Sequence, residues 1–193
     1  MDALQTKNLS KVFGGVKAVN SLSVSIKKGD ITGIIGPNGS GKTTLTNVLT
    51  GLHRIDGGAV IVGGEKERER IRSHEVYDLG ITRTFQNVRL FEQISVLDNV
   101  LVSVTKRGAL SALFEKHKTF HEEKAKEVLT SVGLWEKRNE KAVNLSYGQR
   151  KLLEIARALA TDADTILFDE PFAGLFPEMA KLVSGIMKEL RAS

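Results

Sequence analysis

A glycine-rich stretch constrains the fold of this chain more than any other feature. Residues 36–43 read Gly-Pro-Asn-Gly-Ser-Gly-Lys-Thr and match the phosphate-binding P-loop pattern G-x-x-x-x-G-K-[ST] at every fixed position. The apolar run 31–35 before this loop predicts a buried strand, and residues 44–49 after it predict a helix. Strand, glycine loop and helix are the context in which this pattern binds phosphate, so we expect an α/β fold organised around such a site.

The residue types of the loop agree with that chemistry. Glycine has no Cβ, so the backbone N–H groups of the loop can converge on phosphate oxygens, and the positive end of the following helix adds to the attraction. Lys42 can place its charge on the β- and γ-phosphates, and the Thr43 hydroxyl can bind the Mg²⁺ that bridges them. The residues predicted to bind nucleotide here are Gly36, Pro37, Asn38, Gly39, Ser40, Gly41, Lys42, Thr43 and Thr44.

Two adjacent carboxylates end a second apolar strand later in the chain. The largely apolar run 165–168 leads directly into Asp169 and Glu170, and Pro171 then ends regular structure. In a P-loop protein such a pair has a natural assignment. Asp169 is expected to hold Mg²⁺, directly or through water, and Glu170 to orient the attacking water or accept its proton.

Two other stretches are ambiguous when taken alone. Phe13 stands before a Gly-Gly turn and could stack on adenine, although an aromatic residue at this position is also typical of a core or hairpin. Ser146 and Gln149 have the spacing of a helix capping box, and the N–H groups of such a helix end attract phosphate. A plain helix cap would have the same sequence.

Composition narrows the class of protein. The chain has 193 residues, of which 41% are hydrophobic and 26% charged, and no apolar run approaches the roughly 20 residues of a membrane span. We therefore expect a soluble globular domain without a secretory signal, for which any membrane contact comes through a partner. The absence of cysteine excludes a disulfide scaffold and a cysteine-bound zinc site and is compatible with the cytosol. The net charge of +5 fits either an anionic partner or a solvated basic surface.

The order of predicted elements gives a coarse domain plan. Strands are expected at 4–9, 18–26, 59–62 and 81–85, and apolar residues at helical spacing follow Gln86. His117 and His121 lie four residues apart in this helical part, but with no third ligand nearby they indicate an exposed helix face rather than a metal site. A last helix is predicted from Pro177.

Taken in order, these stretches resemble the nucleotide-binding subunit of ATP-binding cassette (ABC) transporters, from about residue 4 to residue 193. The resemblance implies a P-loop NTPase (RecA-like) α/β core with an antiparallel β subdomain and an inserted helical subdomain. It places the core at 1–86 and 150–193 and the helical subdomain at 87–149. The matching positions are Phe13 (A-loop), 36–43 (Walker A), Gln86 (Q-loop), 145–149 (the LSGGQ signature, with Tyr147 replacing its first glycine) and 165–170 (Walker B).

The resemblance also implies roles and partners. ATP and Mg²⁺ are the expected cofactors, with Lys42, Gln86 and Glu170 in catalysis, and with Thr43, Gln86 and Asp169 at the metal. Two subunits, identical or sister chains, would stack head to tail, so that the signature residues Ser146, Gly148 and Gln149 of one chain contact the ATP of the other. Phe13 becomes the adenine platform.

A narrower likeness concerns the transported solute. Arg-Thr-Phe-Gln-Asn at 83–87, Leu90 with Phe91, Val-Leu-Asp-Asn-Val at 96–100 and the LSYGQ signature look like the ATPases of branched-chain amino acid importers. This implies integral membrane permease subunits as partners, a solute-binding protein indirectly, no nucleic acid, and a peripheral position at the cytoplasmic face of the inner or plasma membrane.

Two departures from the family pattern are expected to matter. Phe176 stands in the D-loop (173–177) where many members carry Asp or Asn, and no histidine follows His121, although members have a switch histidine near the γ-phosphate. We therefore expect a C-terminally truncated chain that binds nucleotide, hydrolyses it poorly and tends to associate through an uncovered sheet edge.

Two alternatives to an importer ATPase remain at this stage. The first is a nucleotide-binding interaction module with little turnover, which the departures above motivate. The second is a soluble ABC ATPase acting on DNA or ribosomes, against which stand the single cassette, the absence of long heptad runs and the lack of zinc-binding cysteines.

Overall fold

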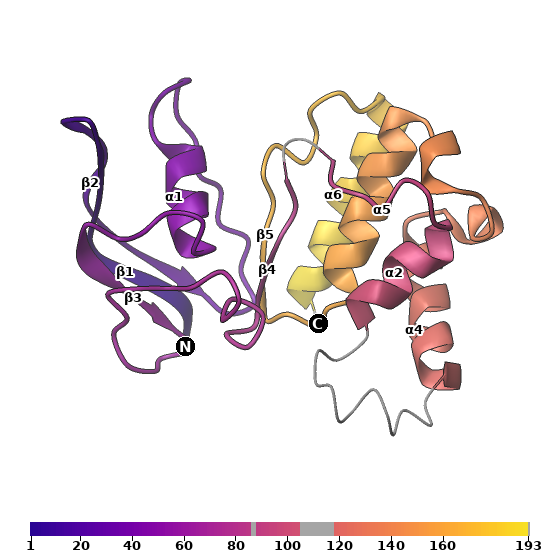
Figure 1. Ribbon diagram of the computed structural model, residues 1–193, viewed down its shortest axis with the longest axis horizontal. Helices are drawn as coiled ribbons and strands as arrows, with labels where there is room; N and C mark the ends of the chain where they lie inside the picture. The colour runs from indigo at the N-terminus through magenta and orange to yellow at the C-terminus, as the bar shows by residue number, and fades with distance from the viewer. Residues whose placement is uncertain (86–87, 105–117, 193) are drawn as a thin grey trace. The chain divides into compact units, whose positions relative to one another are not determined.

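A computed structural model describes residues 1–85, 88–104 and 118–192 (Figure 1). The chain forms two compact units. The first contains Met1–Arg83, Asp164–Asp169 and Leu190–Ser193, and the second contains Thr84–Ala163 and Glu170–Glu189. The division predicted from the sequence, a core at 1–86 and 150–193 with a helical subdomain at 87–149, stays a prediction.

The first unit begins with an antiparallel sheet. Strands β1 (Asp2–Phe13) and β2 (Val16–Lys27) form a hairpin, and β3 (Gly57–Val62) pairs with the other edge of β1, which gives the order β2-β1-β3. The turn between β1 and β2 consists of Gly14 and Gly15, both at positive φ. The predicted strands 4–9, 18–26 and 59–62 are thus confirmed, and each extends beyond its predicted bounds.

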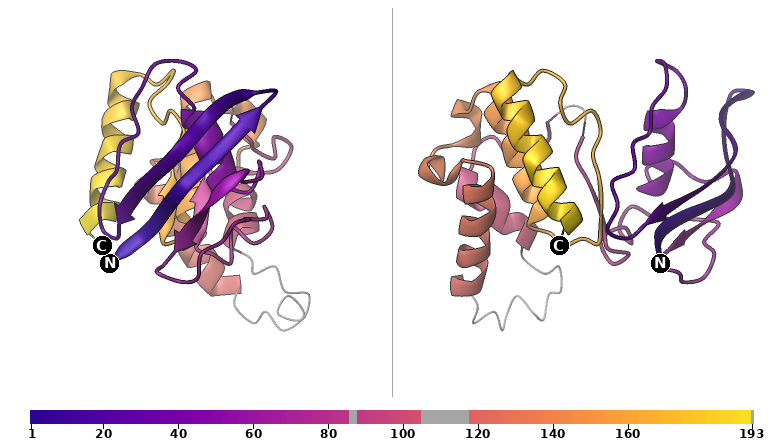
Figure 2. Two further views of the ribbon diagram at one scale, coloured as in Figure 1. Left: turned by 90° about the vertical axis from the view of Figure 1, so that its left-hand side faces the viewer. Right: turned by 180° about the vertical axis from the view of Figure 1, so that it is seen from behind.

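Helix α1 (Lys42–Leu49) lies on one face of this sheet, as Figures 1 and 2 show. The helix predicted after the glycine loop is therefore confirmed. Its apolar face and the inward side chains of the sheet bury each other, which is the main favourable contribution to the stability of this unit. The buried residues of this core are Leu4, Leu9, Val19, Leu45, Val48, Leu49, Val60, Val62, Ile71, Val76 and Ile81.

A second, two-stranded sheet completes the first unit. β4 (Ile81–Arg83) and β5 (Thr165–Leu167) are parallel, and their register pairs Ile81 with Thr165 and Arg83 with Leu167. Both predicted strands are confirmed, although each ends earlier than expected. The pairing carries Asp169, two residues after Leu167, to the end of β4.

The strand predicted at 31–35 is wrong. The structure shows an irregular, exposed segment there, in which the side chain of Ile35 is 94% exposed. A strand requires a neighbour for its N–H and C=O groups. In the described part of the chain, β1, β2 and β3 pair among themselves and β4 pairs with β5, so no strand pairs with this segment.

The second unit is built from helices, and the helix expected from Pro177 is confirmed. Its elements are α2 (Val96–Val104), α4 (Lys118–Ser131), the short 3₁₀ helices η1 (Trp135–Lys137) and η2 (Ala142–Asn144), α5 (Tyr147–Leu159) and α6 (Pro177–Ala192), of which α6 ends in the first unit. Helix α2 packs against α4 and α5, and α5 lies beside α6, where Gly148 lies against Met179 (Figure 1). Within the described residues, no helix is both long and apolar enough to span a bilayer.

Candidate nucleotide site

The glycine loop needs its glycines for geometric reasons. Gly41 caps helix α1 at its N-terminus in the left-handed conformation, with φ of 89°, and a Cβ added to it would lie 2.1 Å from the main-chain oxygen of Ala18. At Gly36 an added Cβ would lie 2.6 Å from the Ser40 hydroxyl oxygen. Both distances are far inside van der Waals contact. At Gly41 the close atom belongs to the backbone and φ is positive, so this position requires glycine, whereas at Gly36 the Ser40 side chain would have to turn away to admit a Cβ.

Lys42 spans the loop from the first turn of α1. Its ammonium group donates to the main-chain oxygens of Gly36 at 2.7 Å and Pro37 at 2.8 Å. The ammonium group of Lys42 thus lies beside the loop. When phosphate binds, it can donate to phosphate oxygens in place of these two carbonyl oxygens. Thr43 follows Lys42 on the same helical turn. Thr43 and the loop residues 36–40 are all exposed.

Asp169 lies close to helix α1 because Arg83 links the two. The Arg83 guanidinium donates to the Asp169 carboxylate at 2.6 Å and to the Asn47 side-chain oxygen on α1, also at 2.6 Å. The Arg83 and Asp169 side chains are only 5% and 12% exposed. In the sequence, Arg83 is notable only as the first residue of the stretch 83–87, which looks like the ATPases of branched-chain amino acid importers. The β4–β5 register that places it beside Asp169 could not be read from the sequence.

The two predicted metal ligands of the first unit are of the type that suits magnesium. A hydroxyl on Thr43 and a carboxylate on Asp169 are the oxygen ligands that Mg²⁺ prefers, and Mg²⁺ usually takes its other ligands from phosphate and water. The described residues contain no group of three or more His, Asp or Glu that could hold a metal by themselves. A metal bound by Thr43 and Asp169 would take its remaining ligands from phosphate and water.

Phe13 ends strand β1 with its ring 43% exposed. The ring meets His53 edge-on, with centroids 5.1 Å apart, and the Lys11 ammonium lies 5.1 Å from the ring centroid. Lys11 in turn pairs with Asp56 at 3.0 Å. An exposed aromatic ring fixed by such neighbours is compatible with the predicted adenine platform, which stays a prediction.

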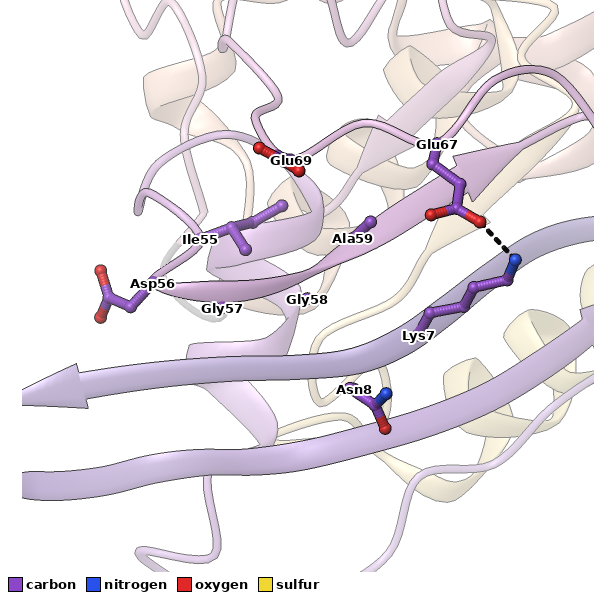
Figure 3. Close-up of a pocket in the computed structure, with 9 residues that line it drawn as sticks. All are labelled: Lys7, Asn8, Ile55, Asp56, Gly57, Gly58, Ala59, Glu67 and Glu69. Carbon is purple, nitrogen blue, oxygen red and sulfur yellow. Dashed lines mark hydrogen bonds and ion pairs between the residues drawn. The ribbon is translucent and has the colours of Figure 1, made fainter.

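A cavity of about 520 Å³ also lies in the first unit, at the edge of the β1–β3 sheet. Figure 3 shows Lys7 and Glu67 pointing toward each other across it, joined by an ion pair. Asp56 and Glu69 add two further carboxylates to its wall. An acidic wall repels phosphate, so this cavity is not a candidate for the nucleotide.

The signature stretch begins helix α5 in the second unit. The Ser146 hydroxyl accepts from the Gln149 N–H at 3.3 Å and the Gln149 side chain accepts from the Ser146 N–H at 3.0 Å, which confirms the predicted capping box. A Cβ on Gly148 would lie 2.4 Å from the Met179 sulfur on α6. The Tyr147 ring, which replaces a glycine of the family pattern, packs on Gly174: a Cβ there would lie 2.8 Å from it.

Two buried charged side chains of α5 contact the loops on either side, and the sequence analysis missed both. Lys151, 2% exposed, donates to the main-chain oxygens of Glu170 at 2.6 Å and Ala173 at 3.1 Å. The Glu154 carboxylate accepts from the N–H groups of Phe85 at 3.1 Å and Arg89 at 3.4 Å. Burial raises the pKa of Glu154 although these hydrogen bonds oppose the shift. Gln86, predicted to act at the metal and in catalysis, lies outside the described residues.

The residues predicted for the site are divided between the two units. The first unit contains the glycine loop, Thr43 and Asp169, and the second contains the signature, Glu170 and the D-loop. Glu170 itself has a left-handed backbone, with φ of 47°. Such a conformation is costly for a residue other than glycine and is common at functional sites.

A glycine loop that opens a helix, a largely buried carboxylate linked to that helix through Arg83 and a capped signature helix define a P-loop protein of the ATP-binding cassette class. The family model described as "ABC transporter" matches residues 19–173. The chain belongs to this family, so it is a nucleotide-binding protein of the ABC ATPase class, and the predicted α/β P-loop NTPase fold is confirmed.

Curated relatives and solved structures agree with this assignment. The chain is 37% identical to the high-affinity branched-chain amino acid transport ATP-binding protein LivG of Salmonella typhimurium, over 97% of this chain and 76% of the relative. It is 41% identical to the probable LivG of Methanocaldococcus jannaschii, over 100% of this chain and 77% of the relative.

Two solved structures match closely. The first is the ADP conformation of MJ1267, an ATP-binding cassette of an ABC transporter, with a TM-score of 0.85 and 40% identity over 100% of this chain and 78% of that one. The second is the dimeric post-hydrolysis state of the ATP-binding cassette MJ0796 bound to ADP and Pi, with a TM-score of 0.82 and 27% identity over 97% and 82%.

Proposed function

We propose that this chain is the ATP-binding and ATP-hydrolysing subunit of an importer for branched-chain amino acids. The observation that carries the proposal is the likeness to ATP-binding proteins of branched-chain amino acid transport, at 36–42% identity over nearly the whole chain. The site geometry supports the nucleotide part of the proposal, because the loop, Lys42 and Asp169 are arranged for a triphosphate and its metal.

In this proposal the first unit binds the nucleotide. The N–H groups of the loop 36–41 and the N-terminus of α1 hold the phosphates, and Lys42 moves its hydrogen bonds from Gly36 and Pro37 to phosphate oxygens. Phe13 stacks on the adenine. Thr43 and Asp169 hold Mg²⁺, whose chemistry is to neutralise charge on the β- and γ-phosphates when it is bound.

The second unit supplies the residues of hydrolysis and of the partner's site. Glu170 orients the attacking water or takes its proton, and Gln86 contacts the metal. Ser146, Gly148 and Gln149 contact the γ-phosphate of ATP held by a second subunit. The dimeric post-hydrolysis state of MJ0796 supports such an assembly by analogy. The second subunit is either an identical chain or a sister chain.

The remaining partners follow from the transporter assignment. Integral permease subunits form the path for the solute, and a solute-binding protein delivers it, so the chain works at the cytoplasmic face of the membrane without entering it. Phe176 in the D-loop is 75% exposed, and its ring is available to face the second subunit. An apolar side chain there would replace the polar contact that many family members make.

The proposal is tested by uptake in the source organism. Replacing the chromosomal copy with the Lys42→Ala variant should abolish uptake of radiolabelled leucine, isoleucine and valine at low concentration, and the wild-type copy should restore it. Unchanged uptake of all three would overturn the solute assignment. If the purified wild-type protein dimerises on ATP but releases no phosphate, an interaction module with little turnover replaces the hydrolytic part of the proposal.

A further inference from the structure

One guanidinium group joins the two segments that carry the predicted metal ligands. Arg83, the last residue of β4, donates to the Asp169 carboxylate through one terminal nitrogen at 2.6 Å. Its other terminal nitrogen donates to the Asn47 side-chain oxygen at 2.6 Å and lies 3.4 Å from the Thr50 hydroxyl. Asn47 is part of helix α1, the helix that carries Thr43 in its first turn.

The surroundings show that this contact is specific. The Arg83 side chain is 5% exposed, and a buried charge is tolerated only where it is paired and hydrogen-bonded. Arginine suits the position because its donors form a planar, rigid fork, whereas the lysine ammonium is a single point charge. The fork therefore fixes the separation between two segments that are distant in sequence, and it engages the Oδ2 atom of Asp169 while doing so.

We propose that Arg83 is a positioning residue of the magnesium site. It holds the Asp169 carboxylate against helix α1, so that this carboxylate and the Thr43 hydroxyl serve the same metal. The proposal rests on the proposed function, since it takes Asp169 and Thr43 as the Mg²⁺ ligands. Arg83 itself contacts neither nucleotide nor metal.

The alternative is that Arg83 competes with the metal. A guanidinium also neutralises the carboxylate, so its removal would then strengthen metal binding. The two effects have opposite signs. Positioning predicts that removal of Arg83 weakens the metal contribution to nucleotide binding, and competition predicts that removal strengthens it.

The decisive quantity is the ratio of the ATP Kd in EDTA to the ATP Kd in Mg²⁺, measured by calorimetry on the purified chain. For the wild type the ratio should exceed one. In Arg83→Gln it should fall by about 10-fold, the size expected for the loss of one charge-assisted hydrogen bond. The Kd in EDTA should change less than about 2-fold, because the phosphate loop is untouched. Arg83→Lys keeps the positive charge but loses the planar fork of donors. Its ratio should lie between that of the wild type and that of Arg83→Gln.

Three further variants make the outcome decisive. Arg68→Gln is the matched control: it removes a partly buried ion pair with Glu65 at 3.0 Å in the same unit and should leave the ratio unchanged. Asn47→Ala removes one acceptor but keeps the Arg83–Asp169 ion pair, and it should lower the ratio less than Arg83→Gln does. It replaces Arg83→Gln should that variant fail to fold, as judged by circular dichroism.

Asp169→Ala separates the two proposals. If this variant keeps the wild-type ratio, Asp169 is not a metal ligand and the metal part of the proposed function fails. If Asp169→Ala lowers the ratio but Arg83→Gln leaves it unchanged or raises it, the positioning role of Arg83 is overturned while the proposed function stands. Mn²⁺ bound with ADP gives a second readout, because its electron paramagnetic resonance spectrum should differ between the wild type and Arg83→Gln and not in Arg68→Gln.

Discussion

The buried ammonium of Lys151 donates to the main-chain oxygen of Glu170 at 2.6 Å, and so ties helix α5 to a residue with a left-handed backbone. The same ammonium reaches Ala173 at 3.1 Å. The turn that presents Glu170 is thus held from the helix that begins with the signature. In the proposed dimer, that helix serves the ATP of the second subunit, so Lys151 connects residues of two different nucleotide sites.

We predict that Lys151→Met destabilises the chain by about 2 kcal/mol. The substitution removes two hydrogen bonds from a charged donor, a loss that the release of a buried charge offsets only in part. Urea unfolding followed by circular dichroism gives the free energy of unfolding. Arg150→Met is the control: Arg150 is 33% exposed, with Glu92 at 3.7 Å, and should lose less than about 0.5 kcal/mol. Equal losses in the two variants would contradict the structural role of Lys151.

Gly41→Ala should destabilise the chain by about 3 kcal/mol and weaken ATP binding. The added methyl group would lie 2.1 Å from the main-chain oxygen of Ala18 and would force alanine to a φ of 89°. Gly33→Ala is the matched control, because a Cβ there meets nothing within 4 Å and φ is not positive. Thermal unfolding and ATP titration of both variants check the prediction, which is wrong if Gly41→Ala behaves like Gly33→Ala.

The sequence predicted what depends on neighbours along the chain. Glycine spacing located the loop and α1, and the serine–glutamine spacing located the start of α5 with its capping box, because these features involve residues three to five positions apart. The prediction of a strand at 31–35 was wrong because hydrogen-bond pairing between strands is not a local property of the sequence. An apolar run fits a strand, but its hydrogen bonds depend on a neighbour that the run itself does not specify.

The contacts that support the site could not be predicted from the sequence, because they too join residues that are far apart along the chain. Arg83 and Asp169 are 86 positions apart and meet only because β4 and β5 are parallel and in register. In the sequence, Lys151 is one of several charged residues on an amphipathic helix. Only the fold shows that its ammonium group is buried and donates to the main-chain oxygen of Glu170. A basic residue on the buried face of a predicted helix was the one available signal.

Lys42→Ala should weaken ATP binding by at least about 10-fold, since it removes the fixed positive charge from the β/γ-phosphate position. The melting temperature should hardly change, because the two acceptors of Lys42 lie in an exposed loop. Lys28→Ala is the control, as Lys28 is exposed and pairs with Asp164 at 3.2 Å in the same unit. ATP affinity that is the same in both variants would remove Lys42 from the site.

Glu170→Gln should leave ATP affinity within about 2-fold and slow phosphate release by at least about 100-fold. The amide keeps the shape of the side chain but cannot take a proton from water. Size-exclusion chromatography with ATP should then show a longer-lived dimer than the wild type gives. Phosphate release at the wild-type rate would place the general base elsewhere.

Glu154 makes the stability of the chain depend on pH in a predictable direction. Burial raises the pKa of Glu154 above its ordinary value of 4.5, and its Oε2 atom is buried without a hydrogen-bond donor among the residues that the structure describes. Because the folded state holds the proton more tightly than the unfolded state, the contribution of Glu154 is fully present below pH 4.5. This contribution is lost as the pH rises through the raised pKa.

Glu154→Gln keeps an oxygen acceptor for the N–H groups of Phe85 and Arg89 and does not ionise. The free energy of unfolding of wild type minus that of Glu154→Gln should therefore fall as the pH is raised from 4.5 and then level off. Urea titrations at a series of pH values measure this difference, and a difference that rises with pH would show that Glu154 is stabilised as the anion.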